Sequence, residues 1–377
     1  MKQENLCNCK KIKKYMMYDV IVVGAGPAGS TTAKYAAENG AKTLLIDRRK
    51  EIGVPLQCGE FLPDKKEIKD IFPKAEGLSE LFDIDEDLIS KKTDTINMIS
   101  PKGKEYKIHF KGFSLDRPKF DKRLAYDAVD AGAELKLHVV ATGLKNGMVV
   151  TNKGIFKGKI IVGADGPFSR IAKWSGLSTP SNLSPCILCL VKGDFSSEIK
   201  MYFGGVAPGG YAWIIPKSDG ANIGLGVQKN LNKVSLKKLL SKFLEGYVHD
   251  YEEILFMSGG YVPVSGTIPK TVKDNILIVG DAAGHVMATN GGGIPIAMIC
   301  GRICGKIIGE HINNKVPLEQ YETEWRRCVG KPLKIASDTK KLADFFFKHN
   351  IIESPMRLIG IRGMERAIKC KGLYVRG

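Results

Sequence analysis

The strongest constraint on the fold is a glycine-rich turn between two predicted strands near the N-terminus. Residues 18–23 form a β-branched run typical of buried parallel strands, and they lead directly into the glycine turn 24–29. The alanine-rich stretch 30–39 predicts a helix, and a second strand is predicted over 42–47, ending in an acid. This order of strand, glycine turn, helix, strand and acid is typical of a dinucleotide-binding fold.

Each residue of this pattern has a physical task in nucleotide binding. Gly24 makes the tight turn, Gly26 allows backbone N–H groups to approach a pyrophosphate, and Gly29 allows the helix to come close to the strand. The N-terminus of the helix adds partial positive charge. Asp47 follows the second strand at the usual distance for accepting hydrogen bonds from ribose hydroxyls. A glycine turn alone is a weak signal, but its context favours a nucleotide site, with NAD and FAD both open at this point.

Composition bounds the class of protein and its partners. The chain has 377 residues, enough for two domains, and its 57 Lys and Arg against 40 Asp and Glu give a net charge of +17. Such a charge suits nucleic acid, an anionic lipid or an acidic protein. No nucleic-acid-binding signature accompanies the charge, so we expect no nucleic-acid partner. The most apolar stretch, 291–309, contains Arg302 and Lys306 and predicts no membrane span. Without a secretory signal, a cytoplasmic location is expected.

Nine cysteines are scattered through the chain, and their odd number favours reduced thiols over a disulfide framework. Cys186 and Cys189 have the C-x-x-C spacing of metal ligands, but no second pair is positioned to complete a tetrahedral site. They lie in an apolar, strand-like run. We therefore predict a packed strand there and no metal site.

A second nucleotide motif near residue 280 favours FAD over NAD. The apolar run 276–279 leads into Gly280 and Asp281, and a glycine-rich stretch, 291–293, precedes an apolar helix. An acid at a strand end can bind hydroxyls of FAD, and a glycine-rich helix start can face the flavin ring. Two such motifs some 250 residues apart fit a discontinuous FAD domain better than a compact NAD domain. A simple strand-turn-helix packing unit is the alternative.

The ordered motifs support a resemblance to a known family. Together with the strand ending at Asp165-Gly, they resemble the fold of the class A flavoprotein hydroxylases. Within that superfamily, Pro55-Leu-Gln-Cys58-Gly-Glu60 resembles the PxxCG(E) motif of the geranylgeranyl reductase family, and Tyr211-Ala-Trp213-Ile-Ile-Pro216 resembles its YxWxFP motif. The resemblance implies saturation of prenyl chains. Archaeal members of that family reduce digeranylgeranylglycerophospholipids.

The resemblance also implies site residues. It indicates that FAD is contacted by Gly24, Gly26, Ala28, Gly29, Asp47, Cys58, Gly59, Phe61, Arg117, Ala141, Asp281, Gly293 and Ile294. Tyr211 and Trp213 would line the prenyl pocket. The sequence departs from the family motifs at Phe61, where glycine is usual, and at Ile215, where phenylalanine is usual. These differences concern the prenyl pocket more than the flavin.

The chemistry of an isolated alkene suggests roles for some of these residues. No neighbouring carbonyl accepts negative charge, so protonation is expected to accompany hydride transfer. The faces of Tyr211 and Trp213 would stabilise a developing tertiary cation by about 1–2 kcal/mol. Cys58 is the first candidate for a catalytic or flavin-gating role, with a packing role as the equal alternative, and Glu60 is the second candidate.

The predicted fold class is α/β: a Rossmann-type FAD-binding domain with an inserted β-sheet substrate domain and a helical C-terminal region. The predicted divisions are a basic extension (1–15), a discontinuous FAD-binding domain (16–60, 112–176 and 259–310), a substrate-binding sheet domain (61–111 and 177–258) and a C-terminal helical region (311–377). The basic residues after position 347 suit either a helix lying on an anionic membrane or an ordinary surface helix.

The predicted function is FAD-dependent reduction of the isoprenoid double bonds of geranylgeranylated glycerophospholipids. The alternatives are a flavin monooxygenase or halogenase on the same fold, and a non-enzymatic prenyl-binding carrier. Because the sequence holds no second dinucleotide fingerprint, reduced ferredoxin, a deazaflavin or NAD(P)H all remain open as electron donor. The positive charge suits peripheral binding at the cytoplasmic face of a membrane.

Overall fold

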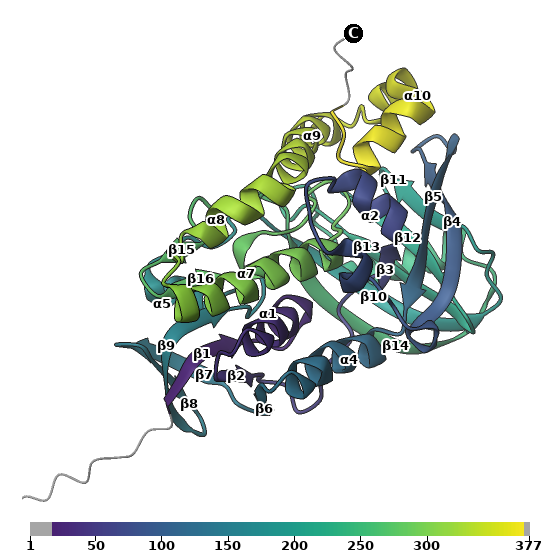
Figure 1. Cartoon of the computed structure of the whole chain (residues 1–377). Helices are drawn as coiled ribbons and strands as arrows, with labels where there is room; N and C mark the ends of the chain where they lie inside the picture. The colour runs from purple at the N-terminus through teal and green to yellow at the C-terminus, as the bar shows by residue number, and fades with distance from the viewer. Residues whose placement is uncertain (1–16, 373–377) are drawn as a thin grey trace, which may run out of the picture.

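The computed structural model describes residues 17–372, so the predicted extension 1–15 lies outside the described residues. A first sheet is built around the glycine turn, and its central strands pair in parallel (Figure 1). Its strand order is β15-β16-β9-β1-β2-β6, with the β7–β8 hairpin attached to β9. The bounds are β1 (Met17–Val23), β2 (Thr43–Ile46), β6 (Glu134–Lys136), β7 (Ala141–Lys145), β8 (Met148–Thr151), β9 (Gly154–Gly163), β15 (Val272–Lys273) and β16 (Ile276–Ile278).

Helices cover both faces of this sheet because β1 is apolar on both sides. Val20 and Val22 pack in the same cluster as α1 (Pro27–Glu38), α4 (Arg117–Asp130) and α7 (Ile294–Asn314), whereas Ile21 packs with α5 (Arg170–Ser175) on the other face. Helices α1 and α7 approach closely because α7 carries glycines at intervals of four residues, Gly301, Gly305 and Gly309. A Cβ on Gly305 would lie 2.5 Å from the Thr32 carbonyl oxygen.

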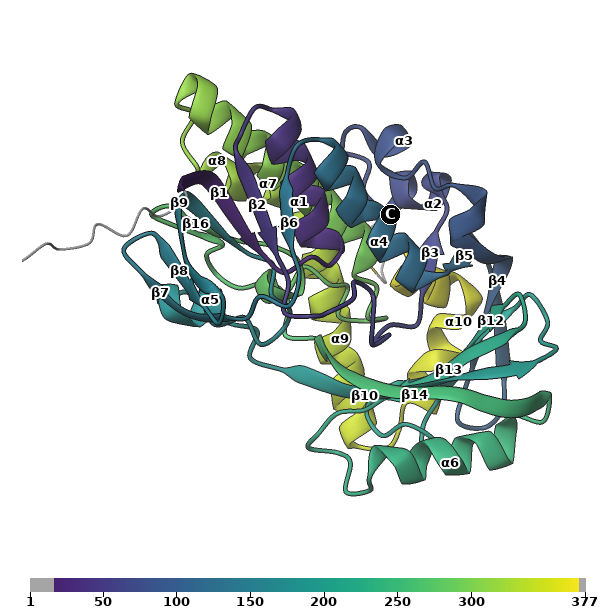
Figure 2. The same cartoon turned by 90° about the horizontal axis from the view of Figure 1, so that it is seen from below.

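A second sheet, largely antiparallel, forms the other half of the molecule. Its order is β14-β10-β13-β12-β11-β4-β5-β3, in which β11 and β4 pair in parallel. Helix α6 (Leu236–Tyr247) covers its outer face (Figure 2). The bounds are β3 (Phe61–Pro63), α2 (Lys65–Ile71), α3 (Leu78–Leu81), β4 (Ile89–Ile99), β5 (Glu105–Leu115), β10 (Leu183–Gly193), β11 (Ile199–Phe203), β12 (Tyr211–Lys217), β13 (Gly220–Gly226) and β14 (Tyr251–Pro263).

The last helices of the described residues bridge the two halves. Helix α8 (Gln320–Trp325) is anchored to the first sheet, where the Tyr321 hydroxyl donates a hydrogen bond to the Ile278 carbonyl at 3.0 Å. A π-helical turn (Arg326–Gly330) leads into α9 (Lys331–Lys348), which is followed by α10 (Glu353–Ile368). Helix α10 packs against β5 of the second sheet and bends at Gly360, whose φ is +57°.

The observed fold confirms the predicted class, a Rossmann-type domain with a second sheet and a helical C-terminal region. One predicted boundary was wrong, since the first helix begins at Pro27 and not at residue 30. Proline suits the first turn of a helix, where its missing N–H costs nothing. The predicted domain boundaries themselves remain a prediction. Within residues 17–372, no helix is long and apolar enough to cross a membrane.

Candidate active site

In the glycine turn after β1, an added Cβ atom would clash at two of the three glycines and would meet open space at the third. Gly24 has a φ of +106°, and a Cβ there would lie 2.3 Å from the Ala164 carbonyl oxygen. A Cβ on Gly29 would lie 1.8 Å from the Gly24 carbonyl oxygen, whereas one on Gly26 meets nothing within 4 Å. Gly26 is the N-cap of α1, and no side chain caps the helix there. A phosphate group therefore fits over Gly26, at the positive end of α1.

Asp47 follows β2, and its carboxylate is fixed beside the same turn. Its two oxygens accept hydrogen bonds from the backbone N–H groups of Ala25 and Arg49, each at 2.7 Å. Because a carboxylate has about four acceptor positions, Asp47 retains capacity for ribose hydroxyls. The contact of Asp47 with a ribose remains a prediction.

Asp281 lies just beyond β16, in a short 3-10 turn (Gly280–Ala283). Burial raises its carboxyl pKa from 3.8 to about 6, and Arg117 opposes this shift only in part. Among the described residues, no group donates a hydrogen bond to this carboxylate. Gly293, the N-cap of α7, lies beside it, since a Cβ on Gly293 would be 3.5 Å from Asp281 Oδ1. A half-buried carboxylate without a protein donor is suited to the hydroxyls of a bound ligand.

These residues fit FAD. Two helix N-termini and two carboxylates lie at the carboxyl ends of parallel strands, where nucleotides bind in open α/β sheets. Of the other predicted contacts, Ala28 is buried in α1 and Arg117 begins α4. The Arg117 guanidinium makes two hydrogen bonds of 3.0 Å to Asp121, and this carboxylate raises the pKa of Arg117 despite its burial. Ala141 begins β7, and its carbonyl accepts a hydrogen bond from Arg170.

The PxxCGE loop lies between β2 and β3 and contacts the second sheet. Cys58 is half-buried, and burial raises the pKa of its thiol. Its sulfur accepts a hydrogen bond from the Glu60 N–H at 3.2 Å. Gly59 lies against β12, since a Cβ there would be 3.0 Å from Ile215 Cδ1 and 3.8 Å from Trp213 Nε1. The two motifs that lie 150 residues apart in the chain therefore meet in space.

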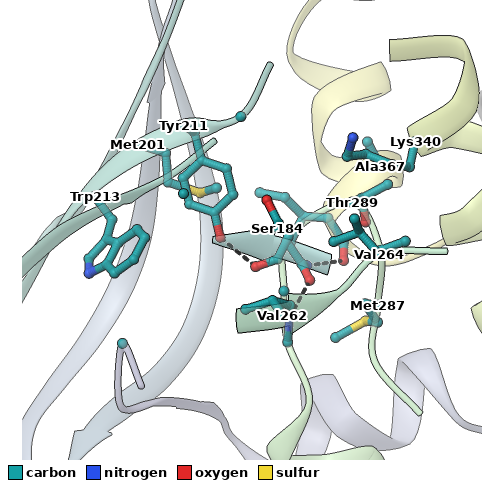
Figure 3. Close-up of a pocket in the computed structure, with 18 of the residues that line it drawn as sticks. Ser184, Met201, Tyr211, Trp213, Val262, Val264, Met287, Thr289, Lys340 and Ala367 are labelled. Atoms are coloured by element: carbon teal, nitrogen blue, oxygen red, sulfur yellow. Dashed lines mark hydrogen bonds between the residues drawn. The ribbon is translucent and has the colours of Figure 1, made fainter. Parts of the chain in front are cut away.

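The aromatic motif lies on β12 and presents two rings to the same side of the sheet (Figure 3). The Tyr211 and Trp213 ring centroids are 6.0 Å apart. The Tyr211 hydroxyl donates a 2.5 Å hydrogen bond to the Asn290 carbonyl, next to the glycine stretch that precedes α7. Trp213 Nε1 donates to Asn222 Oδ1 at 2.9 Å. Both aromatic side chains are thereby fixed in orientation.

A cavity of about 440 Å³ joins these elements. Eight of the predicted site residues line it: Cys58, Gly59, Glu60, Phe61, Tyr211, Trp213, Gly293 and Ile294. The other eight, Gly24, Gly26, Ala28, Gly29, Asp47, Arg117, Ala141 and Asp281, do not line this cavity. Phe61 lines its wall, with its ring centroid 6.2 Å from that of Phe110, and its predicted FAD contact remains a prediction.

Several lining residues were not predicted from the sequence. Helices α9 and α10 form one wall, with Phe346, Phe347, Met356 and Ile359 among its residues. Their amphipathic spacing is visible in the sequence, but the surface that they cover is not. Asn222 and Lys217 do not line the cavity but bond to the PxxCGE loop, and they were also missed. The available signals were a single polar residue in the apolar run of β13 and a lysine directly after the aromatic motif.

No group of three or more potential metal ligands occurs among residues 17–372. Cys186 and Cys189 lie in β10, where Cys189 is fully buried, and burial raises the pKa of both thiols. Side chains three positions apart in a strand point to opposite faces. The two sulfurs therefore lie on opposite faces of the sheet, in keeping with a packed strand.

Comparison with known proteins identifies the class. The family described as FAD dependent oxidoreductase matches residues 19–54, and the family described as geranylgeranyl reductase catalytic domain matches residues 188–262. The fold is shared with flavin-dependent brominase Bmp2, at a TM-score of 0.68 and 19% identity over 96% of each chain. The protein is therefore an FAD-dependent oxidoreductase.

Closer relatives identify the family within this class. Digeranylgeranylglycerophospholipid reductase of Methanococcus vannielii is 36% identical over 355 residues, which are 87% of this chain and 88% of that protein. A geranylgeranyl bacteriochlorophyll reductase-like protein from Thermoplasma acidophilum superimposes with a TM-score of 0.79 at 29% identity, covering 89% of this chain and 90% of that one. The chain belongs to the digeranylgeranylglycerophospholipid reductase family.

Proposed function

We propose that this protein reduces the isoprenoid double bonds of geranylgeranylated glycerophospholipids, with FAD as its cofactor. The observation that carries the proposal is the apolar cavity that extends from the PxxCGE loop, past Tyr211 and Trp213, to α9 and α10. Its aromatic and aliphatic lining suits a polyisoprenoid chain. In this proposal the first sheet binds FAD and the second sheet covers the lipid chain.

We infer that FAD is held at its phosphates by the N-terminus of α1, at its ribose by Asp47 and at further hydroxyls by Asp281. When bound, FAD supplies the hydride for the alkene. Tyr211 and Trp213 orient the chain and offer aromatic faces to positive charge that develops on it, and the dry cavity strengthens this attraction. Cys58 is our first candidate for the proton donor, because burial raises its thiol pKa and keeps the proton on sulfur. Glu60 is the second.

We further propose that the protein works at a membrane surface, on its cytoplasmic face. Helices α9 and α10 and the turn between them expose large apolar side chains: Leu342, Phe345, Ile351, Leu358 and Ile361. Lys341, Lys348, Arg357 and Arg362 are exposed on the same helices. Leu342 and Leu358 also line the cavity, so a lipid chain could pass from the bilayer into it between apolar side chains. Apolar and basic groups together suit an anionic phospholipid surface.

The proposal is tested by anaerobic incubation of the FAD-loaded protein with dithionite and a geranylgeranylated glycerophospholipid in vesicles, followed by mass spectrometry of the lipid. We expect a gain of two hydrogens per double bond. No gain in mass would overturn the reductase proposal. In a parallel aerobic reaction, a gain of oxygen or halide in place of hydrogen would point to a monooxygenase or halogenase, and tight lipid binding without FAD would point to a carrier.

The electron donor is tested in the same assay by replacing dithionite in turn with reduced ferredoxin, a reduced deazaflavin and NADPH. We propose that an external donor supplies the electrons, because the sequence holds one dinucleotide fingerprint and we assign that fingerprint to FAD. The net charge of +17 favours an acidic protein carrier. Faster flavin reduction by NADPH than by ferredoxin would contradict this preference.

A further inference from the structure

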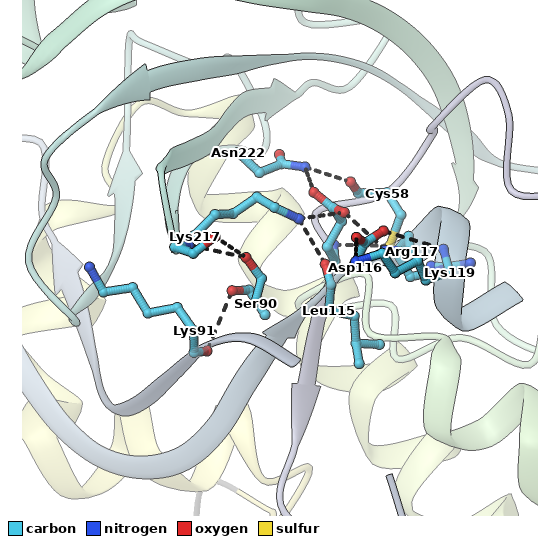
Figure 4. A network of polar contacts seen from close by, with 12 residues as sticks. Cys58, Ser90, Lys91, Leu115, Asp116, Arg117, Lys119, Lys217 and Asn222 are labelled. Carbon is cyan, nitrogen blue, oxygen red and sulfur yellow. Dashed lines mark hydrogen bonds and ion pairs between the residues drawn. The ribbon is translucent and has the colours of Figure 1, made fainter. Parts of the chain in front are cut away.

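A buried asparagine connects the two family motifs. Asn222 lies in β13 with no exposed surface, and its side chain bonds to three groups from other parts of the chain. Figure 4 shows its bonds to the PxxCGE loop. Its Oδ1 accepts from Trp213 Nε1 at 2.9 Å, and its Nδ2 donates to the Cys58 carbonyl and to Glu60 Oε2, each at 2.9 Å. One side chain thus fixes the indole ring and the PxxCGE loop relative to each other.

Lys217 completes the same network from the end of β12. Its Nζ donates hydrogen bonds of 2.8 Å to Glu60 Oε1 and to the Leu115 carbonyl. Only 18% of the Lys217 side chain and 1% of the Glu60 side chain are exposed. The Arg117 N–H also approaches Glu60 Oε1, at 3.4 Å. Both oxygens of Glu60 are therefore engaged by the protein.

The backbone at Glu60 explains why the loop needs such an anchor. Glu60 has a φ of +68°, a left-handed conformation that residues other than glycine rarely adopt. Such conformations persist only where the surroundings enforce them. The bonds to Asn222 and Lys217 provide that enforcement two residues after Cys58, whose thiol accepts a hydrogen bond from the Glu60 N–H.

We propose that Asn222 and Lys217 are positioning residues and that Glu60 is an anchor and not the proton donor. Asn222 holds Trp213 and the Cys58 carbonyl directly, and both residues hold the Glu60 carboxylate of the same loop. The proposal rests on the proposed function in so far as Cys58 and Trp213 act on the alkene. It assigns a geometric task to the buried ion pair, and it chooses between the two candidate proton donors.

Neutralising both partners of the ion pair separates these roles. Removing one partner of a buried ion pair leaves an unpaired charge, whereas replacing both by neutral groups of similar volume is often tolerated. The variants are Lys217→Met, Glu60→Gln and the double substitution, with Lys91→Met as a matched control. Lys91 also lies in the second sheet, but its Nζ bonds to the Phe195 carbonyl and not to Glu60.

Alkene reduction is measured as kcat and KM, together with FAD content. We expect each single substitution to lower kcat by about tenfold or more with little change in KM, because each leaves the other partner buried without its counter-charge. The double variant should recover to within about threefold of the wild type, and the control should match the wild type. A double variant as inactive as Glu60→Gln would overturn the proposal and assign the proton to Glu60.

A second measurement does not depend on the lipid and thus separates failure of this proposal from failure of the proposed function. The alkylation rate of Cys58 is followed by peptide mass spectrometry in the FAD-loaded variants. We expect it to change severalfold in Lys217→Met and to return in the double variant. An unchanged rate in Lys217→Met would overturn the positioning role, even if the protein reduces the lipid as proposed.

Discussion

Replacing Asp281 by asparagine tests the electrostatics of the proposed FAD site. Burial raises the carboxyl pKa to about 6 in the folded protein, against 3.8 for the free group. Since one pKa unit corresponds to about 1.36 kcal/mol, ionised Asp281 costs the FAD-free protein about 3 kcal/mol above pH 6. The folded pKa lies above the unfolded one, so this stability is present at low pH and is lost as the pH rises through about 6. Roughly half of the loss falls between pH 5 and pH 8.

The assay is urea unfolding of FAD-free protein at several pH values in that range. Between pH 5 and pH 8, the unfolding free energy of the wild type should fall by about 1 kcal/mol more than that of Asp281→Asn, because asparagine does not titrate. Asp94→Asn is the control, since Asp94 is exposed on β4 and distant in sequence from every FAD motif. Equal pH slopes in the wild type and Asp281→Asn would refute the reasoning.

The affinity for FAD should also depend on pH through the Asp281 carboxyl group. Hydroxyl groups that donate to the ionised carboxylate lower its pKa, so FAD binding releases a proton below pH 6 and the affinity for FAD falls there. The Asp281→Asn variant should bind FAD more weakly, with an affinity that varies less between pH 5 and pH 7. Fluorescence titration with FAD measures both. A wild-type affinity independent of pH in this range would contradict the proposed contact.

Three further predictions concern the glycine turn, the thiol and the outer helices. Gly26→Ala should lose FAD while its unfolding free energy stays within about 1 kcal/mol of the wild type, and FAD retention by this variant would contradict the prediction. Gly29→Ala should be destabilised by about 1–3 kcal/mol or more, because its Cβ would lie 1.8 Å from a carbonyl oxygen. Cys58→Ser should retain FAD but lose alkene reduction by about 100-fold or more, and full turnover in the anaerobic assay would exclude the thiol as proton donor. Leu358→Asp should weaken binding to anionic vesicles in a flotation assay more than the control Leu255→Asp on β14 does. Both side chains are exposed, but only Leu358 borders the cavity. Equal binding by the two variants would argue against the proposed membrane surface.

The local signals in the sequence predicted the first sheet well. The glycine turn, the β-branched strand and the acid after the second strand are close in the chain, and their physical roles depend on short-range geometry. Gly24 and Gly29 have the close backbone contacts that the pattern requires. The second sheet was predicted only as an inserted β-sheet substrate domain, without the neighbours of its strands. The order of its eight strands came from the structure alone.

The sequence by itself determined the fold class, the cofactor and the family, because each depends on motifs whose residues are close together or match a family pattern. The tertiary structure decided what these motifs contact. The partners of Glu60 are Asn222 and Lys217, more than 150 residues further along the chain, and no periodicity in the sequence links them. The wall that α9 and α10 contribute to the cavity likewise depends on how α10 packs against β5 and against α9. Long-range packing determines such contacts, whereas local backbone preferences determine a glycine turn.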